Sequence, residues 1–137
     1  MKAFLDSSAF AKRYIEEAGS QSIDEICLEA TELCLSVICI PELISALNRR
    51  VRESSLSQKN YRVIKKALLE DVRDITIINL TPEVISATTR LLEDNTLRAM
   101  DALHVACALE CEADLFVSSD KQQMIAARNA GLMTRLV

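Results

Sequence analysis

The chain has 137 residues, half of them hydrophobic, and its 16 basic and 20 acidic side chains give a formal net charge of −4. This length suits one domain with its own core, and two Gly and two Pro exclude a collagen-like chain or a flexible linker. No apolar run reaches the roughly 18 residues of a membrane span, and an acid at residue 6 comes too early for a signal peptide, so we expect a cytoplasmic protein with no membrane association. Five cysteines, an odd number, are expected to be reduced thiols.

Short apolar runs, typical of buried strands, alternate with segments whose apolar residues recur every three or four positions, typical of helices. In chain order the pattern predicts a strand at 2–5, helices at 9–17 and 20–31, a strand at 33–38, a helix that starts near Pro41, a helix at 58–72, a strand at 74–80, helices at 82–94 and 99–111, a strand at 114–118, a helix at 120–130 and a strand at 132–136. This alternation favours an α/β fold, with a mostly parallel sheet covered by helices on both faces. We predict one domain over residues 1–137.

Two helix starts carry clear capping signals. Ser57 precedes the helix predicted at 58–72, and Thr81 is followed by Pro82 and Glu83. A hydroxyl residue at the N-cap, a proline at the first helical position and an acid in the first turn are the preferred residues there.

Four carboxylates lie where a parallel sheet places its functional crevice. Asp6 directly follows the first predicted strand, Asp120 follows the fourth, and Glu42 is the second residue of the helix predicted after the second strand. Asp101 is in the first turn of helix 99–111 and joins them if that helix begins at the same edge. In open α/β sheets, ligands bind outside the carboxyl ends of the strands, where the strand order reverses.

Each acid also has a structural interpretation. Asp6 suits a turn or a helix N-cap, and Glu42 and Asp101 suit the first turn of a helix. Asp120 suits an N-cap, with Gln123 as its capping-box partner. As a group, however, acids directly after separate strands exceed what helix capping requires.

Four carboxylates in one crevice repel each other, and a divalent cation resolves that conflict. An all-oxygen ligand set favours a hard ion such as Mg²⁺ or Mn²⁺. Such a centre suits hydrolysis of phosphodiesters, because the ion activates water and neutralises charge in the transition state. On this basis, replacing Asp6 or Asp101 by Asn is expected to abolish cleavage while leaving the metal-free fold intact or more stable.

These segments resemble the motifs of the PIN-domain ribonucleases, and most closely those of VapC-type toxins from prokaryotic toxin–antitoxin pairs. The resemblance spans nearly the whole chain and rests on LDSSAFAKRY with Asp6, IPELISAL with Glu42, RAMDALHVACAL with Asp101, and FVSSDKQQ with Asp120. It implies that these four acids, in this order, are catalytic and bind Mg²⁺ or Mn²⁺. It also implies supporting hydroxyl groups, which the sequence offers at Ser7, Ser8, Ser118 and Ser119.

The resemblance implies a three-layer fold whose parallel five-stranded sheet has the order 3-2-1-4-5. The function it implies is that of a metal-dependent endoribonuclease, the toxin partner of a small protein antitoxin that lies in a groove near the acids. It further implies a homodimer. The apolar side chains of the two N-terminal helices are the face we expect to form it: Phe10, Tyr14, Ile23 and Ile26.

The predicted RNA contacts come from an uneven distribution of basic residues. Residues 49–66 hold seven basic side chains and one acid, so Arg49, Arg50 and Arg52 are predicted to contact phosphates; a solvated helix surface is the equal alternative. Further predicted contacts near the site are Lys12, Arg13 and Lys121. Aromatic residues make up only 4% of the chain, which favours folded RNA or an exposed loop over stacking along a single strand.

Two other functions stay open at this point. One is a PIN nuclease of RNA processing or decay with no antitoxin, and the other is a non-catalytic, doubly wound binding or signalling module. The second fits less well, because no Gly-rich loop follows the first strand and Asn79-Leu80-Thr81 stands where a receiver-like domain has an acid. His104, three residues after Asp101, is either a packed side chain or a catalytic base.

Overall fold

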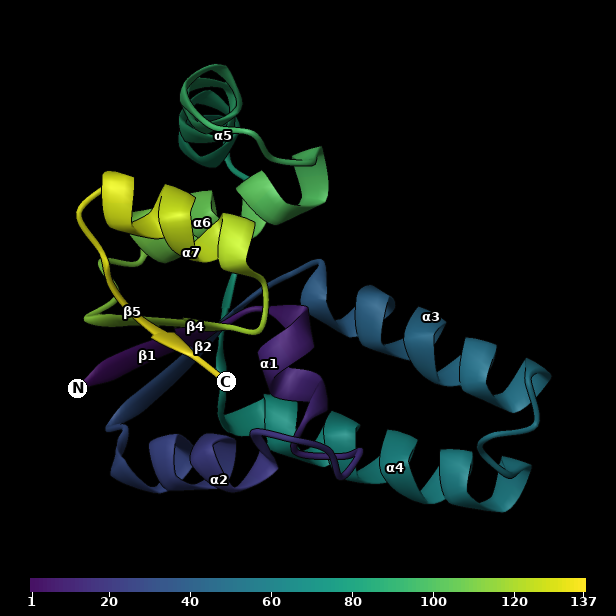
Figure 1. The fold of residues 1–137 in the computed structure, drawn as a ribbon. Coiled ribbons are helices and arrows are strands. Elements are labelled where there is room, and N and C mark those ends of the chain that lie inside the picture. Colours follow the sequence, from purple (N-terminus) through teal and green to yellow (C-terminus); the bar gives the residue numbers. More distant parts are fainter.

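A computed structural model describes all 137 residues, and a five-stranded sheet lies at its centre (Figure 1). The strands are β1 (Lys2–Leu5), β2 (Glu32–Ser36), β3 (Thr76–Ile78), β4 (Leu115–Ser118) and β5 (Met133–Leu136). Their order is β3-β2-β1-β4-β5, and each neighbouring pair is parallel. The order reverses between β1 and β4, and the predicted sheet order and fold class are therefore confirmed.

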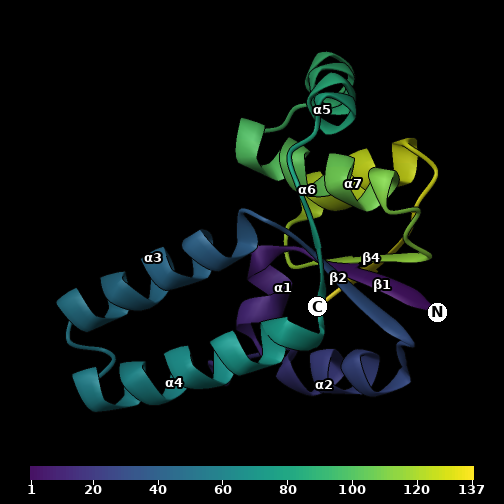
Figure 2. The same cartoon turned by 180° about the vertical axis from the view of Figure 1, so that it is seen from behind.

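Helices cover both faces of the sheet, as Figures 1 and 2 show from opposite sides. The helices are α1 (Ser7–Ala11), α2 (Ser20–Glu29), α3 (Cys39–Arg52), α4 (Gln58–Asp71), α5 (Pro82–Asp94), α6 (Ala99–Glu110) and α7 (Lys121–Asn129). Helices α5, α6 and α7 lie on one face, and α1, α2 and the end of α4 lie on the other. Helices α3 and α4 run side by side and project from the sheet as a two-helix arm.

The core has two halves, one on each face of the sheet. Strand β1 alternates between them: Phe4 packs into the half under α5, α6 and α7, while Ala3 and Leu5 pack into the half over α1 and α2. This is the period of two that a strand imposes on its side chains. No helix is long and apolar enough to cross a membrane.

The helix pair expected to supply a dimer face contributes to the core instead. Phe10, Ile23 and Ile26 are completely buried within the half of the core that α1 and α2 cover. Of the four residues named for this face, only Tyr14 is partly exposed, so these side chains do not provide an apolar surface for a second copy.

Helix α1 is shorter than the helix predicted at 9–17. It begins at Ser7, because the Asp6 carboxylate caps it by accepting a hydrogen bond from the Ala9 amide (2.8 Å). After Ala11 the backbone changes to bonds between residues three apart. The Lys12 ammonium then donates to the carbonyl of Ala18 (2.6 Å), which stabilises a compact loop in place of further helical turns.

Other boundaries differ for local reasons. Of the strand predicted at 74–80, only the residues of β3 form a strand, because the partner strand β2 ends at Ser36, opposite Ile78. Helix α3 begins at Cys39, which makes Glu42 its fourth residue, not its second; Pro41 fits because amides of the first turn have no helical partner. The caps at Ser57 and Thr81 are confirmed by hydrogen bonds from the amides of Asn60 and Val84.

Candidate functional site

The carboxyl edge of β1 and β4 brings the predicted acids into one region. Asp6 follows β1 directly, and Asp120 is the second residue after β4. Asp101 is the third residue of α6, and Glu42 comes from the first turns of α3. The charges of Asp120, Asp6 and Glu42 all affect the ionisation of Asp101, which places the four acids within electrostatic reach of one another.

The Asp6 carboxylate lies at the centre of a dense set of hydrogen bonds. Its side chain is only 1% exposed and accepts from four donor groups: the Ser8 hydroxyl (2.7 and 2.9 Å), the Ala9 amide (2.8 Å), the Ser118 hydroxyl (2.7 Å) and the Gln123 side-chain amide (2.9 Å). Asp6 therefore caps α1, as its structural interpretation predicts, and it also lies at the sheet edge, where the predicted site requires it. With so many donors around it, the carboxylate is fixed in place.

Gln123 is a site residue that the sequence did not predict as one. Its Nε2 donates to Asp6 Oδ2 (2.9 Å) and to Asp101 Oδ1 (3.4 Å), so one amide nitrogen joins two of the four acids. The expected capping box does not form, because the Gln123 side chain turns toward Asp6 instead of back to the Asp120 amide. The sequence signal for this role is the position of Gln123 one helical turn after Asp120, but helix capping explains the same spacing more simply.

Glu42 forms a second cluster with Ser7 and His104. Its Oε1 accepts a hydrogen bond from the Ser7 hydroxyl (2.7 Å) and lies 2.6 Å from His104 Nε2. Burial raises the pKa of Glu42, but the hydrogen bonds from His104 and Ser7 outweigh burial and hold that pKa below its ordinary value. Glu42 is therefore a fixed anion at neutral pH.

His104 is built into the protein interior. It is 2% exposed, and its ring packs edge-on against Phe4, with centroids 6.4 Å apart. Nε2 faces Glu42, and Nδ1 is buried with no hydrogen-bond partner. Because neither nitrogen faces solvent, the geometry favours the packed interpretation, in which His104 positions Glu42, over a catalytic base.

Asp101 and Asp120 are partly exposed, as Glu42 is. Burial, followed by the charge of Asp120, raises the pKa of Asp101, and Asp6 and Glu42 act in the same direction. Asp120 caps α7 by accepting from the amides of Gln122 (2.8 Å) and Gln123 (3.4 Å). Since one of its oxygens makes both of these bonds, the other is left for a ligand.

The predicted hydroxyl groups divide between the two clusters. Ser8 and Ser118 donate to Asp6, and Ser7 donates to Glu42. Ser119 contributes its backbone amide, which donates to Ser8 Oγ (3.1 Å), while its own hydroxyl is buried without a partner. Of the two serines after β4, Ser118 is therefore the one whose hydroxyl supports the first acid.

The donor set fits a hard divalent cation, although the side chains are not arranged as a finished cage. No group of three or more His, Cys, Asp or Glu side chains is already gathered around one point. Oxygens of Asp6 and Asp101 nevertheless converge on a single nitrogen, and the buried Gln123 Oε1 has no partner. The oxygens of Asp6 and Asp101 and the free oxygen of Asp120 are ligands of the kind that Mg²⁺ and Mn²⁺ prefer.

A polar hollow opens over Asp101 and Asp120. Its volume is about 560 Å³, and its lining includes Asp101, Asp120, Gln122 and Arg98. Arg98, the exposed N-cap residue of α6, is a second residue that the sequence did not predict. Lys121 is exposed beside Asp120 at the start of α7.

The other predicted basic contacts lie in different surroundings. Arg49 and Arg52 are exposed on the outer half of α3 and Arg50 is partly exposed. The Lys12 side chain is buried, and its ammonium donates to the Ala18 carbonyl and pairs with Glu17 in the loop after α1. Arg13 pairs with Asp71 of α4 (3.8 Å), so the structure does not bring Lys12 or Arg13 to the acids.

Comparisons with known proteins agree on the fold. A family model described as PIN domain matches residues 3–129. FitAcB from Neisseria gonorrhoeae is 14% identical, with a TM-score of 0.71 over 96% of this chain and 95% of that one. VapC20 from Mycobacterium tuberculosis, a toxin that cleaves the sarcin-ricin loop, is 15% identical, with a TM-score of 0.70 over 96% of each chain. VapBC2 from Rickettsia felis, bound to a promoter DNA fragment, is 12% identical, with a TM-score of 0.70 over 100% and 99%.

At these identities the solved structures establish a shared fold and no more. A search of curated proteins finds no match. The family match covers both clusters of site residues, from Asp6 and Glu42 to Gln123.

Proposed function

Because this chain belongs to the PIN-domain family, we propose that it is a metal-dependent endoribonuclease and the toxin of a toxin–antitoxin pair. The observation that carries the proposal is the convergence of Asp6 and Asp101 on one buried amide at the carboxyl edge of the sheet. Structural neighbours described as toxin–antitoxin complexes support the second half of the proposal.

The residues of the site have separate tasks in this proposal. Asp101 and Asp120 line the hollow, Asp6 lies buried behind Asp101, joined to it through Gln123, and Glu42 supplies a carboxylate from the first turns of α3. Hydroxyl and amide donors keep Asp6 fixed, and Ser7 and His104 hold the Glu42 carboxylate and keep its pKa below the ordinary value. A bound Mg²⁺ or Mn²⁺ would supply the Lewis acid that polarises the phosphate and lowers the pKa of a water molecule.

Removal of divalent metal is the direct test of this function. RNA cleavage by the purified protein is expected to require Mg²⁺ or Mn²⁺, to fall at least about 100-fold in excess chelator, and to return when the ion is restored. Cleavage that continues at the same rate in chelator would exclude the metal-dependent mechanism.

We propose that the arm formed by α3 and α4 contacts the RNA backbone. Arg49 and Arg50 begin about 10 Å along the α3 axis from Glu42, at 1.5 Å per residue. Neither they nor Arg52 forms an ion pair within the protein, so their charges are available to phosphates. Arg98 lines the hollow and Lys121 is exposed beside Asp120, so both add positive charge near the acids.

Replacing Arg49, Arg50 and Arg52 together by Gln is expected to weaken RNA binding. Each phosphate contact contributes roughly 0.7 to the log–log dependence of affinity on salt for single strands, so three lost contacts reduce the slope by about two units. Turnover at saturating RNA should change little, since these residues position the backbone and perform no chemistry. Binding measured over a series of salt concentrations checks both statements.

A variant with the same change in charge provides the control. Replacing Lys2, Arg90 and Arg128 by Gln also removes three charges, from positions outside both helices of the arm. It is expected to leave the salt slope close to that of the wild type. If the two triple variants have equal slopes, the α3 arginines belong to an ordinary solvated helix surface.

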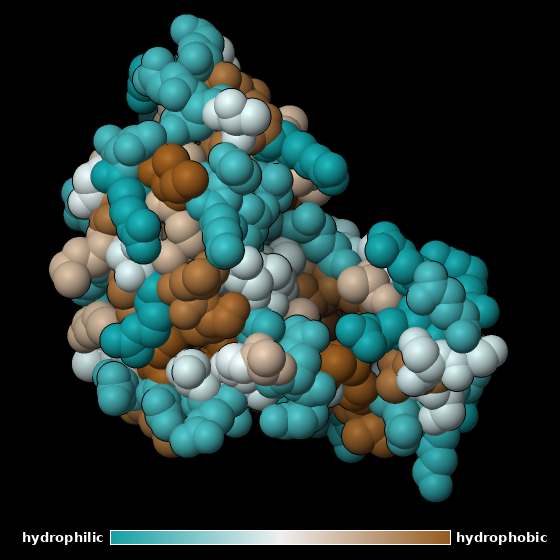
Figure 3. Space-filling model, viewed as in Figure 1, coloured by the Kyte–Doolittle hydropathy of each residue, from teal (hydrophilic) through white to brown (hydrophobic).

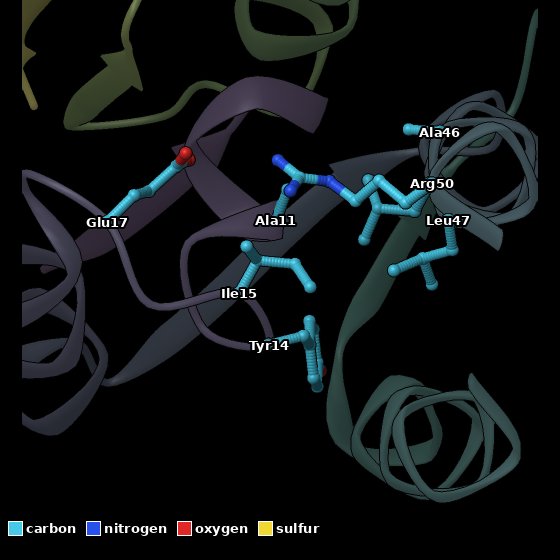
Figure 4. Close-up of a pocket in the computed structure, with 8 residues that line it drawn as sticks. Ala11, Tyr14, Ile15, Glu17, Ala46, Leu47 and Arg50 are labelled. Carbon is cyan, nitrogen blue, oxygen red and sulfur yellow. The ribbon is translucent and has the colours of Figure 1, made fainter. Parts of the chain in front are cut away.

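An apolar hollow at the base of the arm is our proposed antitoxin contact. Figure 3 shows hydrophobic side chains where the arm meets the body, and in Figure 4 Ala11, Tyr14 and Ile15 face Ala46 and Leu47 of α3 across a space of about 70 Å³. We infer that one apolar side chain of the antitoxin packs there. A short gene directly upstream that encodes a DNA-binding protein would identify this partner.

The homodimer implied by the family resemblance stays a proposal without an assigned surface. Three of the four residues expected to form it, Phe10, Ile23 and Ile26, are buried, and Tyr14 is partly exposed. Any dimer contact must therefore use side chains other than these three, and light scattering at tens of micromolar protein would establish whether a dimer forms.

A further inference from the structure

The buried side-chain amide of Gln123 occupies the position at which the carboxylates of Asp6 and Asp101 would both contact a cation. The side chain is 3% exposed, and Nε2 donates one proton to each of Asp6 and Asp101. Ionised carboxylates only accept hydrogen bonds, so the nitrogen, and not the oxygen, of the amide must face them. Oε1 then points elsewhere in the interior and has no partner.

This arrangement leaves the Gln123 side chain with one unsatisfied hydrogen-bond acceptor. A buried acceptor without a hydrogen bond costs free energy, and Gln123 tolerates that cost while Nε2 makes two charge-assisted bonds. The nitrogen thereby performs part of the task of a positive ion, because it draws together two acids that otherwise repel each other. Asp101 and Asp6 cannot both turn these oxygens to a cation while the amide remains between them.

We propose that Gln123 is a positioning residue that closes the carboxylate site in the metal-free protein and sets the affinity for the divalent cation, because its amide must be displaced when the ion binds. This inference rests on the proposed metal-dependent function. It adds that the Gln123 amide competes with the ion for the two carboxylates, which weakens binding of the ion and stabilises the metal-free protein.

Other side chains around Asp6 do not share this property. The Ser8 and Ser118 hydroxyls each contact Asp6 among the acids and Ala9 donates from the backbone; a rotating hydroxyl or a fixed helical amide can stay beside a metal-bound carboxylate. Only the Gln123 amide bridges two of the predicted ligands. It is therefore the one group whose removal should strengthen, and not weaken, metal binding.

The test compares Gln123→Met with the wild type. Met has the same unbranched length as Gln but no donor, so it fills the space while leaving Asp6 and Asp101 without the bridge. Titration calorimetry with Mg²⁺ and Mn²⁺ is expected to give a dissociation constant about tenfold lower in the variant, because the wild type gives up at least one charge-assisted hydrogen bond on binding. Thermal unfolding in chelator should occur about 5 °C lower in the variant, and saturating Mg²⁺ should remove most of that difference.

A matched control is Gln21→Met. Gln21 also donates to a carboxylate, Glu25 (3.0 Å), but on the exposed surface of α2. It should change neither the metal affinity nor the response of unfolding to Mg²⁺. An unchanged dissociation constant in Gln123→Met, with equal destabilisation in chelator and in Mg²⁺, would mean that Gln123 is a structural link only. A weaker constant would mean that Gln123 is itself a ligand, and either result overturns the proposal.

A measurement on the wild type covers the case in which Gln123→Met fails to fold. The side-chain amide protons of Gln123 should exchange slowly with solvent in chelator, and their NMR signals should shift and exchange faster as Mg²⁺ is added. Signals that stay unchanged at saturating Mg²⁺ would overturn the proposal. If the wild type and the variant both bind no ion, the metal-dependent function and this inference fail together; if the wild type binds and the variant binds no more tightly, only the inference fails.

Discussion

Replacing Asp101 by Asn is expected to abolish RNA cleavage while leaving the metal-free protein at least as stable as the wild type. The carboxylate is a predicted metal ligand, and removing it should lower activity at least about 100-fold, beyond the usual effect of losing a residue that only supports a ligand. Stability should not fall, because Asn removes a charge that Asp120 and the other acids repel and can keep its oxygen toward Gln123.

The gain in stability should be small. Asp101 is partly exposed, so solvent screens the repulsion, and an increase of no more than about 0.5 kcal/mol in the free energy of unfolding is expected. Cleavage assays with Mg²⁺ and urea unfolding in chelator measure the two effects. Asp24→Asn, an exposed change on α2, is the control. Asp101→Asn protein that cleaves RNA at the wild-type rate, once contaminating nuclease is excluded, would remove Asp101 from the site.

Replacing Asp6 by Asn should abolish cleavage as well, but it should also destabilise the protein by about 3 kcal/mol. The sequence alone leads to a different expectation, in which loss of either charge leaves the fold unharmed. In the structure the Asp6 carboxylate is buried and accepts from Ala9, Ser8, Ser118 and Gln123. Asn presents an NH₂ group where one oxygen was, so at least one buried donor faces another donor, which costs about 1–3 kcal/mol for each unsatisfied group.

The two substitutions therefore form a contrasting pair at one site. Both remove one charge from the acid cluster, and only Asp6→Asn disrupts the cap of α1 and the bonds to β4 and α7. Urea unfolding of both variants in chelator measures the difference. If Asp6→Asn unfolds within about 0.5 kcal/mol of the wild type, the hydrogen bonds around Asp6 contribute little and its role as a rigid anchor is wrong.

Sequence patterns predicted the sheet and the neighbourhood of the acids because both depend on simple rules. Strand residues such as Phe4 and Leu5 are uniformly apolar, and parallel strands bring their carboxyl ends to one edge, so Asp6 and Asp120 had to be close. The N-caps at Ser57 and Thr81 follow from local hydrogen bonding that the sequence displays directly.

The remaining features depend on contacts between distant segments. Lys12 is a basic residue of the kind that contacts phosphates at a surface, yet its ammonium donates a hydrogen bond to the carbonyl of Ala18. The loop that contains Ala18 has no periodic sequence pattern from which this contact could be predicted. Phe10 belongs to an apolar stripe that would equally suit a dimer face, and only the packing of α1 and α2 on the sheet shows that it is core. A capping box would offer Gln123 a local hydrogen-bond partner, the backbone amide of Asp120. In the structure the Gln123 side chain bonds instead to Asp6, which lies near the other end of the chain.

The chemical ends of the cleaved RNA test the central claim most directly. A site of carboxylates that activates water with a divalent cation hydrolyses the phosphodiester without using the ribose 2′-hydroxyl. The products should therefore carry one phosphate and one hydroxyl end, with no cyclic phosphate, and a single 2′-deoxy substitution at the cleaved nucleotide should leave cleavage intact in Mg²⁺. Products that end in a 2′,3′-cyclic phosphate, with cleavage lost on 2′-deoxy substitution, would contradict the account.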